Sequence, residues 1–515
     1  ELAAVWTLQL SCAEIAKEIE VEIDFLTTRA RNVPERHRSM RAVFGTSWEK
    51  LSRKEKDVLQ KASVFRGGFD RKAAQVVTGA SLYSLSDLIS KSFLSVAENG
   101  RYAIHELLRQ FAAEKLAEQG LLAQEVRASH GRYFLTFLAE RNLTEPAEVL
   151  ESSQNIDNVR AAIRWTVRHQ SRSLDYSIAY TLWKLFDLNG WLLEGETTFR
   201  WIVDQLLPDC VDPLIVENKE DQQSCFRVAV YQNALCKFQT RRYRLLEAEE
   251  SAKLALQWLP ATEEMDFLAL RAESLYYLGM IKFSQGALIQ ALNSYQQAGE
   301  VYKVVGDQRQ FGWVLHGQNV LLQNTGEFDA AEGHLNSMQQ IAVQMDDSGL
   351  ARAKWNELGK LATIRGQLDE AEAYFDKSLE QYADFNWLPV VAYVFRERGE
   401  VSRLKGYYAE AKNYAQRSIA LAEDINMPHP IILSLWLLGN VAVDEGHFET
   451  ALHYFAEYEQ ISTPLQEQIG GPGWALLGLS RLAEARQQFA VSVQRMINNQ
   501  ARPIGLDALV GMAHI

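Results

Sequence analysis

The chain has 515 residues, 47% of them hydrophobic and 23% charged, and its formal net charge is −13. This length is too great for one hydrophobic core and predicts three or four domains, and the absence of a run of 18 apolar residues argues against a membrane-spanning helix. The four cysteines form no Cys-x-x-Cys or Cys/His cluster, which argues against a disulfide framework or a zinc site and favours free thiols in a reducing cytosol. Because only 11 prolines occur, we expect helix almost throughout.

The first recognisable module, residues 34–118, combines helices with a hairpin. A helix is predicted from Leu51, with Ser52 as its N-cap and Glu55 completing a capping box. Asn99 and Gly100 form a typical turn between two short strands. In chain order the predicted elements are helices from Leu51, from Arg71 and over 82–90, strands over 92–96 and 101–104, and a helix from His105. Three helices followed by a β-hairpin is the element order of a winged-helix domain.

This module is basic although the whole chain is acidic. Residues 35–115 contain 15 Lys and Arg against 9 Asp and Glu. The helix over 71–78 nevertheless offers few side chains that could read base edges. Binding of DNA through the winged helix is therefore a minor alternative.

The strongest signal is an internal repeat in the C-terminal half. Five glycines stand 40 residues apart, and an alanine follows each by five positions. Another glycine precedes four of them by seven positions, and a bulky residue follows each alanine by three or four. These positions are Gly286, Gly326, Gly366, Gly406 and Gly446; Ala291, Ala331, Ala371, Ala411 and Ala451; Gly279, Gly359, Gly399 and Gly439; and Tyr295, Leu335, Phe375, Tyr414 and Phe455.

The residue types of the repeat have a physical reason. Two helices cross closely only where a side chain is nearly absent, so a glycine on the first helix and an alanine on the second allow close approach. The glycine between them is expected to end the first helix in a left-handed cap, and the bulky residue to fill the groove between neighbouring pairs. Further units are predicted at Gly190, Gly195 and Phe199, at residues 226–258, and at Ser480, Ala485 and Phe489.

The repeat resembles the tetratricopeptide repeat, whose usual period is about 34 residues. Segments before it resemble the winged helix and helical linker of signal transduction ATPases with numerous domains (STAND proteins), in particular the bacterial multidomain transcription regulators. The similar segments are Arg36–Phe44, Ser63–Phe69, Arg101–Ala112 and Asn155–Ala162. The resemblance implies a regulatory part followed by a tetratricopeptide sensor.

The resemblance also implies that the nucleotide-binding domain lies upstream of this chain. The chain contains no G-x-x-x-x-G-K-[ST] loop, and Glu1–Ala4 resembles the helix that follows the family's adenine-contacting segment. Since the chain starts without Met and stops within a predicted helix, we expect a fragment of a larger protein. ADP or ATP with Mg is then expected in the parent protein, and no cofactor in the fragment.

One residue of this chain is implied to face the nucleotide. Ile104-His105-Glu106 resembles the family's Met-His-Asp motif, whose histidine contacts the β-phosphate of ADP. The resemblance gives His105 that role in the parent protein, while Glu106 departs from the motif. The alternative is that His105 only caps the helix that follows the second strand.

A row of residues on the first helices of the repeats is the candidate ligand-binding site. In a tetratricopeptide superhelix these helices line the concave face. Lys360, Arg396 and Arg403 against Glu400 predict a net positive middle, suited to an acidic or C-terminal carboxylate ligand. The alternative is that these side chains solvate the face or pair with one another. The candidate residues are Trp313, His316, Asn356, Lys360, Arg396, Arg403, Trp436 and Asn440, with the two tryptophans as aromatic anchors.

The predicted fold is therefore mainly α, with a remnant of a helical domain at 1–33, a winged helix at 34–118, a helical arm at 119–225 and a tetratricopeptide α-solenoid at 226–515. The hypothesis for function is that a protein, peptide or small-molecule inducer binds the superhelix, and that the winged helix and arm relay this to ADP/ATP-controlled autoinhibition and oligomerisation. The alternative is a passive scaffold that tethers proteins. No enzyme activity and no metal site are expected in this chain, which we expect to be cytoplasmic.

Overall fold

The computed structural model describes residues 10–15, 25, 39–143, 145–209, 218–383, 387–461, 471–499 and 502–515. These residues are mainly helical, and the one sheet found among them has two strands. The chain divides into two compact units, the first made of Glu1–Asn142 and Ala147–Thr181, the second of Leu143–Pro146 and Leu182–Ile515. Glu1–Ala4 and Cys210 lie outside the described residues, as does most of the predicted remnant at 1–33.

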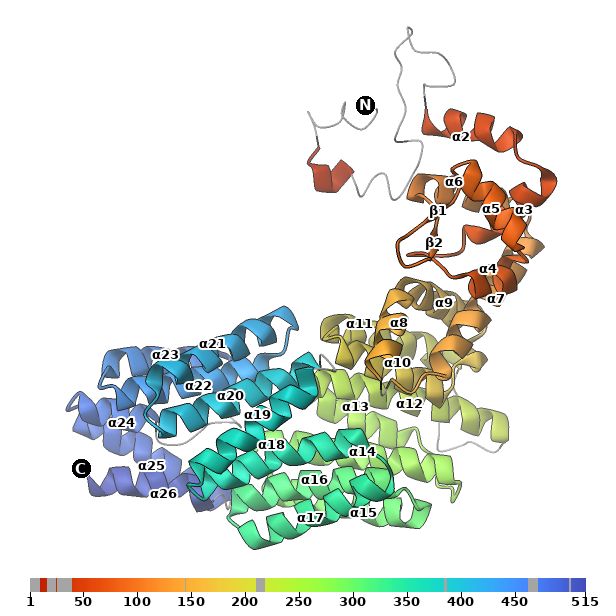
Figure 1. Ribbon diagram of the computed structural model, residues 1–515. Coiled ribbons are helices and arrows are strands. Elements are labelled where there is room, and N and C mark those ends of the chain that lie inside the picture. Colours follow the sequence, from red (N-terminus) through yellow and green to blue (C-terminus); the bar gives the residue numbers. More distant parts are fainter. Residues whose placement is uncertain are drawn as a thin grey trace. The chain divides into compact units, whose positions relative to one another are not determined.

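The first unit contains the predicted three helices, hairpin and following helix (Figure 1). The strands are shorter than expected, with Ser95 opposite Ala103 and Val96 opposite Tyr102 in antiparallel register. An additional helix precedes the three predicted ones. The elements are α2 (Met40–Glu49), α3 (Arg53–Ala62), α4 (Arg71–Thr78), α5 (Leu82–Ser90), β1 (Ser95–Val96), β2 (Tyr102–Ala103), α6 (Glu106–Ala117), α7 (Leu121–Ala139), α8 (Pro146–Gln154), α9 (Ile156–His169), η4 (Ser171–Ser173) and the start of α10 (Tyr176–Leu188).

Local sequence fixes where these helices begin. The Ser52 hydroxyl accepts a hydrogen bond from the Glu55 amide, and the Glu55 carboxylate accepts one from the Ser52 amide at 2.7 Å, which confirms the capping box. Asp70 caps α4 by accepting from the Ala73 amide at 2.6 Å. Leu59, Phe69 and Leu88 are almost completely buried in the core that these helices enclose.

The turn between α3 and α4 is hydrogen-bonded to helix α9. The side-chain amide of Asn158 accepts from the Arg66 backbone N–H at 2.7 Å and donates to the Gly68 carbonyl at 2.7 Å. Gly67 has φ +66°, and a Cβ on it would lie 2.8 Å from Asp157 Oδ2, so both backbone conformation and space require glycine there. This contact joins the three-helix module to the following helices within the first unit.

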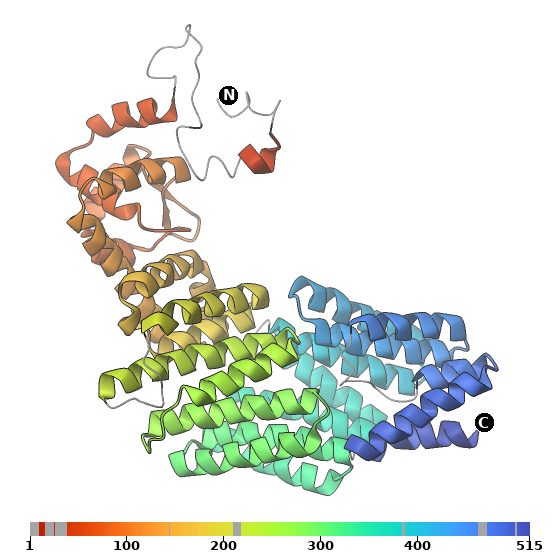
Figure 2. The same cartoon turned by 180° about the vertical axis from the view of Figure 1, so that it is seen from behind.

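The second unit is a series of antiparallel helix pairs (Figures 1 and 2). The pairs confirm the tetratricopeptide-type solenoid, including the early pair at Gly190 and the degenerate pair at 226–258. Helix α12 begins already at Lys219, and the division between the units falls within α10, before the boundary predicted at residue 225. After α10 come α11 (Leu192–Leu206), η5 (Leu207–Asp209), α12 (Lys219–Arg241), α13 (Leu245–Gln257), α14 (Met265–Ser284), α15 (Leu288–Val305), α16 (Gln308–Thr325), α17 (Phe328–Gln344), α18 (Ser348–Ile364), α19 (Leu368–Ala383), α20 (Leu388–Leu404), α21 (Tyr408–Asp424), α22 (Pro428–Asp444), α23 (Phe448–Ile461), α24 (Gly471–Gly478), α25 (Leu482–Asn499) and α26 (Arg502–Ala513).

The repeated small residues lie where the predicted close contacts require them. The five turn glycines have φ between +74° and +84°, and the five alanines are fully buried. A Cβ on Gly359 would lie 2.7 Å from the ring of Phe375, which belongs to the same pair. Tyr295 fills the space beside both Gly279 of its own pair and Gly317 of the next pair. The bulky residue therefore packs within a pair as well as between neighbouring pairs.

The fourth repeat departs from this pattern. Ala415 occupies the position of the bulky residue, and Tyr414 lies partly exposed beside Arg398 and Arg417. A Cβ on Gly399, the glycine of this pair, would meet Leu437 at 2.8 Å and only the Cβ of Tyr414, at 3.2 Å, so that the Tyr414 ring does not cover it. The prediction that Tyr414 fills the groove is therefore wrong, because one residue of shift on a helix moves a side chain by about 100°.

None of the helices within the described residues is long and apolar enough to cross a membrane. In the same part of the chain, no three His, Cys, Asp or Glu side chains gather in a way that could hold a metal ion. Cys12 is exposed with a free thiol, and Cys225 and Cys236 are buried with free thiols.

Candidate ligand-binding site

The first helices of successive pairs lie next to one another along the second unit. Helices α12, α14, α16, α18, α20, α22 and α24 each contact the next helix in this series, whereas the second helices of neighbouring pairs do not pack on one another to a comparable extent in the described chain. In a stack of helix pairs, the helices that lie closer together form the concave side. We call the surface that these helices share the inner face, and all eight candidate residues belong to four of these helices, α16, α18, α20 and α22.

A buried carboxylate, Glu357 on α18, organises the centre of the inner face. Its side chain is only 1% exposed. The Lys360 ammonium donates to Glu357 Oε1 at 2.9 Å, and His316 Nε2 lies 3.5 Å from the same oxygen. The other oxygen, Oε2, accepts from Asn319 at 3.2 Å and from Gln323 at 3.3 Å, both on α16. The carboxylate thus joins two neighbouring repeats through charge-assisted hydrogen bonds.

The electrostatics of Glu357 follow from these partners. Burial alone would raise its pKa, but the Lys360 charge and the hydrogen bonds from His316 and Lys360 lower the pKa to about 2. Burial disfavours the charged form of Lys360 and by itself would lower its pKa. The negative charges of Glu357 and Glu397 outweigh this and raise the pKa of that ammonium above its usual value. Both groups are therefore charged at neutral pH and neutralise each other. Asn356, which donates to Glu357 Oε1 at 3.2 Å, belongs to the same network.

The two predicted arginines are also paired. Arg396 Nη1 donates to Glu397 at 2.9 Å. Arg403 donates to Glu400 at 2.8 Å and to Asp444 on α22 at 2.6 Å. Lys360, Arg396 and Arg403 thus each have a carboxylate partner, so the middle of the row is not a set of unpaired cations.

The prediction of a net positive middle is wrong, because it left out three acidic residues. Glu357, Glu397 and Asp444 supply negative charges from outside the row, and only Arg403 and Glu400 pair with one another within it. The helical spacing between Glu357 and Lys360, three residues, was a signal for this pair.

The two tryptophans differ in role. Trp313 is partly exposed and meets His316 edge to face, with ring centroids 5.6 Å apart. Trp436 is only 6% exposed and packs between Phe455 and Tyr458. Trp436 is therefore a core residue, and only Trp313 remains available as an anchor. Asn440, on the same helix as Trp436, is partly exposed.

A second polar network lies at the end of α12 and was also missed. Arg241 donates from Nε to Asp187 Oδ1 at 3.0 Å, and Trp387 donates from its indole N–H to Asp187 Oδ2 at 3.0 Å. Close by, Tyr393 hydrogen-bonds His429 Nδ1 at 2.7 Å, and His429 stacks on Tyr243. These contacts join helices of the first two pairs of the unit to α20 and α22, a pairing that no local spacing in the sequence indicates.

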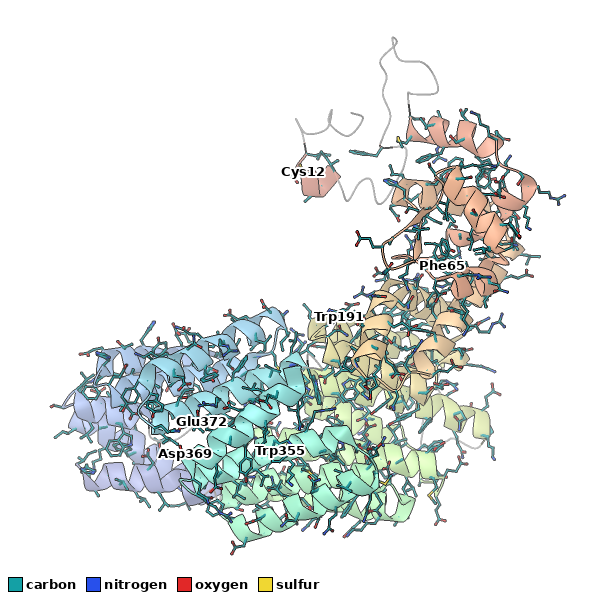
Figure 3. The ribbon with its side chains drawn as sticks, viewed as in Figure 1. Cys12, Phe65, Trp191, Trp355, Asp369 and Glu372 are labelled. Carbon is teal, nitrogen blue, oxygen red and sulfur yellow. The ribbon has the colours of Figure 1, made fainter. Side chains whose placement is uncertain are left out.

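Lys405, at the end of α20, makes an ion pair whose acidic partners are more exposed to solvent. Lys405 donates to Asp369 at 2.7 Å and to Glu372 at 2.5 Å, both on α19 and both labelled in Figure 3. Asp369 is 93% exposed. Such solvated pairs add little stability and offer no special chemistry.

His105, the candidate nucleotide-facing residue, lies in the first unit at the N-cap of α6. His105 is the N-cap residue of this helix, as the alternative has it, but its imidazole is exposed and makes no capping hydrogen bond. The neighbouring Glu106 is engaged by Arg109 at 2.7 Å and by Arg66 at 3.5 Å.

Comparison with known proteins gives limited information. No family model matches this chain. The uncharacterized protein Rv0894 of Mycobacterium tuberculosis H37Rv is 32% identical over 164 residues, and the uncharacterized protein Mb0918 of Mycobacterium bovis matches to the same extent. The match covers 30% of this chain, and the chain spans 39% of the length of these curated relatives.

Solved structures show likenesses at low TM-scores. One is the crystal structure of the STAND protein with a tetratricopeptide repeat sensor PH0952 from Pyrococcus horikoshii, at a TM-score of 0.40 and 15% identity over 89% of this chain and 70% of that chain. A second is a Rap protein complexed with competence and sporulation factor, at a TM-score of 0.44 and 14% identity over 66% of this chain and 96% of that chain. At these scores the likenesses support no transfer of function to this chain.

Proposed function

We propose that the second unit is a binding module for a protein or peptide, and that the chain as a whole is the regulatory and sensor part of a STAND-type signalling ATPase. The observation that supports binding is the inner face. There, hydrogen bonds link polar side chains of α16 with those of α18, and of α20 with those of α22, and Trp313 lies partly exposed beside them. Because Glu357, Lys360, Arg396 and Arg403 are held by fixed partners, this surface loses little conformational entropy when a ligand binds.

The sensor role rests on the sequence resemblance and on the first unit. The motif segments 63–69, 101–112 and 155–162 come together at the turn around Gly67, where Asn158 contacts the backbone and Arg101 donates to Asn155 at 2.9 Å. Such a rigid joint would transmit a movement of the helical arm to the module before it. In the parent protein, an upstream domain would bind ADP or ATP with Mg, and the exposed imidazole of His105 would donate to a phosphate oxygen.

Binding at the inner face is tested by site-specific photo-crosslinking. A benzophenone amino acid replaces Trp313 on the inner face, and in a matched variant it replaces Ile289, which is 67% exposed on a second helix. We expect saturable crosslinking to a protein or peptide from the source organism at position 313 and not at 289. Equal labelling at both positions would reject a specific inner-face site.

The proposed coupling between this chain and an upstream nucleotide-binding domain is tested on the complete gene product. We expect it to retain ADP after purification, and His105→Ala to lower that retention without changing the unfolding midpoint, because the exposed imidazole makes no capping hydrogen bond to α6. The 515-residue chain alone is expected neither to bind nor to hydrolyse ATP. Nucleotide retention that is unaffected by His105→Ala would exclude the role assigned to this residue.

A passive scaffold is the second candidate, and the inner face supports it equally well. The two differ in coupling: a sensor changes its affinity for partner when ADP is replaced by ATP, whereas a scaffold does not. Partner affinity that is the same with both nucleotides in the complete gene product would favour the scaffold.

A further inference from the structure

The turn between α12 and α13 departs from the repeat in one residue. In the five regular repeats, the glycine at this position takes φ between +74° and +84°. Tyr243 stands there in the degenerate pair, because α13 begins two residues after it, as α15 begins two residues after Gly286. Ala248, five residues after Tyr243, is fully buried as the repeat requires. Tyr243 takes φ +63°, a left-handed conformation that is strained for any residue except glycine, so a contact elsewhere must offset the strain.

That contact lies on helices far along the chain. The ring of Tyr243 stacks on the imidazole of His429 near the start of α22, with centroids 4.8 Å apart and planes 6° apart. The same imidazole hydrogen-bonds the Tyr393 hydroxyl of α20 at 2.7 Å. Tyr243 and Leu245, only 8% and 4% exposed, share one hydrophobic cluster with Trp436 of α22. The α12–α13 turn therefore covers part of the inner face, and we call the covered residues, Tyr393, His429 and Trp436, the masked surface.

Two further contacts hold the turn against these helices. The buried carboxylate of Asp187 accepts from Arg241, at the end of α12, and from the indole N–H of Trp387, each at 3.0 Å. A Cβ on Gly190 would lie 2.5 Å from Cγ2 of Ile425, which ends α21. We call these two contacts and the stacking of Tyr243 on His429 the clasp. The clasp joins the first two helix pairs of the second unit to α20, α21 and α22.

The clasp differs in kind from the contacts between neighbouring repeats. Neighbouring pairs meet through glycine, alanine and a bulky residue along whole helix faces, whereas the clasp consists of turns, helix ends and an ion pair. Charged groups regain their hydration when they are exposed, so a contact that buries them gives less net stability than an apolar contact of the same size. This composition favours opening of the clasp while the helix pairs stay folded.

We propose that the masked surface is a peptide-binding part of the inner face and that the α12–α13 turn is its built-in competitor. This inference rests on the proposed binding function of the second unit, to which it adds a ligand chemistry and a form of autoinhibition. The present occupant defines the ligand as a peptide with an aromatic residue followed two positions later by an aliphatic one, as in Tyr243 and Leu245. Since a tethered segment acts at an effective concentration on the order of millimolar or higher, such a peptide binds well only when the clasp is open.

The test uses the complete 515-residue chain and a fluorescein-labelled peptide with the sequence Thr240–Ala248, whose binding is followed by fluorescence anisotropy. Tyr243→Gly removes the occupant and restores the residue of the regular repeats, so the turn keeps its fold. Gly190→Ala keeps the occupant but forces the clasp apart at Ile425. Gly306→Ala is its matched control, because Gly306 also has a positive φ, +79°, while a Cβ there meets nothing within 4 Å.

We expect Tyr243→Gly and Gly190→Ala to bind the peptide at least tenfold more tightly than the wild-type chain, and Gly306→Ala to bind it as the wild type does. A peptide with alanine in place of both Tyr243 and Leu245 should lose this gain. Hydrogen exchange at the start of α22 should be faster in Gly190→Ala than in Gly306→Ala. Addition of the peptide to Tyr243→Gly should slow exchange there, because the peptide covers the masked surface.

Three outcomes would overturn the proposal: no gain in affinity in either opened variant, an equal gain in Gly306→Ala, or equal binding of the alanine-substituted peptide. The turn would then be packing between distant repeats and nothing more. If one of the two opened variants does not fold, the other decides the question. Because Trp313 lies on α16, outside the clasp, saturable crosslinking at Trp313 would still support the proposed function after this inference had failed.

Discussion

Trp387 donates its indole N–H to Asp187 at 3.0 Å, although 200 residues of sequence separate the two. The contact is not isolated, because a Cβ on Gly190 would meet Ile425 at 2.5 Å and the ring of Tyr243 stacks on His429 with centroids 4.8 Å apart. The beginning of the solenoid thus contacts the start of α20 through a hydrogen bond, the end of α21 through the close approach of Gly190 to Ile425, and α22 through a ring stack. Contacts between distant repeats are additional to the nearest-neighbour contacts that stabilise a simple repeat array.

We expect Trp387→Phe to lower the free energy of unfolding by about 2 kcal/mol, because it removes a hydrogen bond to a charged and buried acceptor while keeping an aromatic ring beside Tyr382. Urea unfolding followed by circular dichroism measures the change. Trp355→Phe is the matched control, since Trp355 stacks on Tyr374 on the solenoid (Figure 3) and its indole N–H has no acceptor among the described residues. A loss that is equal in both variants would mean that ring size, and not the bond to Asp187, matters.

The repeat glycines give a second prediction. Gly359→Ala places a methyl group 2.7 Å from the ring of Phe375, so the helices of this pair must separate, and we expect a loss of about 2 kcal/mol in unfolding free energy. Gly333→Ala serves as the control, since a Cβ there meets nothing within 4 Å and the residue is exposed within α17. That change should stabilise the chain by about 0.5–1 kcal/mol. A neutral Gly359→Ala would show that the close approach is not required.

The sequence predicts the fold of the second unit well, because glycine and alanine recur at a regular spacing wherever two helices cross closely. Turns without glycine are harder to predict: Tyr243 takes φ +63° at the turn of the degenerate pair. The candidate site is predicted less well. The row belongs to the first helices, but Trp436 is buried, and helical spacing does not reveal that Asp444 on the next repeat neutralises Arg403. No local sequence pattern indicates the contact of Asp187 with Trp387, because whether the two residues meet depends on the number of repeats between them.

The buried ion pair on the inner face is open to a double-mutant cycle. Glu357→Gln should cost about 3 kcal/mol, because it leaves the Lys360 ammonium without its nearest carboxylate, whereas the combination with Lys360→Met should cost less than the sum of the single changes. Glu332→Gln removes a surface partner of Arg365 and should cost less than about 0.5 kcal/mol. Additive effects of Glu357→Gln and Lys360→Met would show that the two groups do not interact.

The pKa of Glu357 predicts how the second unit responds to acid. It is lowered to about 2 in the folded chain from an ordinary value of 4.5. The unfolded chain therefore binds a proton more readily between these values, so the contribution of Glu357 is complete above pH 4.5 and is lost as the pH falls toward 2. Hydrogen exchange of α18 between pH 5 and 3, with Glu357→Gln as the reference, measures this loss. An identical pH dependence in both proteins would contradict the assignment.

His130 makes the stability of the first unit depend on pH, in a higher pH range than the one predicted for Glu357. Burial lowers the pKa of this imidazole to about 4 from an ordinary 6.5, the hydrogen bond with Asn158 opposes the shift, and the charge of Arg66 adds to it. The unfolded chain takes up the proton first, so stability is complete above pH 6.5 and falls as the pH drops toward 4. With these values the loss at pH 4.5 is about 2.5 kcal/mol.

Hydrogen exchange of α7 and α9 at pH 7 and pH 4.5 measures this effect, and His130→Gln should flatten it. His453→Gln, at a position where the side chain is 70% exposed, should leave the pH dependence unchanged. Because Asn158 connects His130 to the turn at Gly67, protonation of His130 should also loosen the joint between α9 and the three-helix module. Faster exchange at pH 4.5 in α7 but not at the Arg66 amide would show that the histidine and the joint open independently.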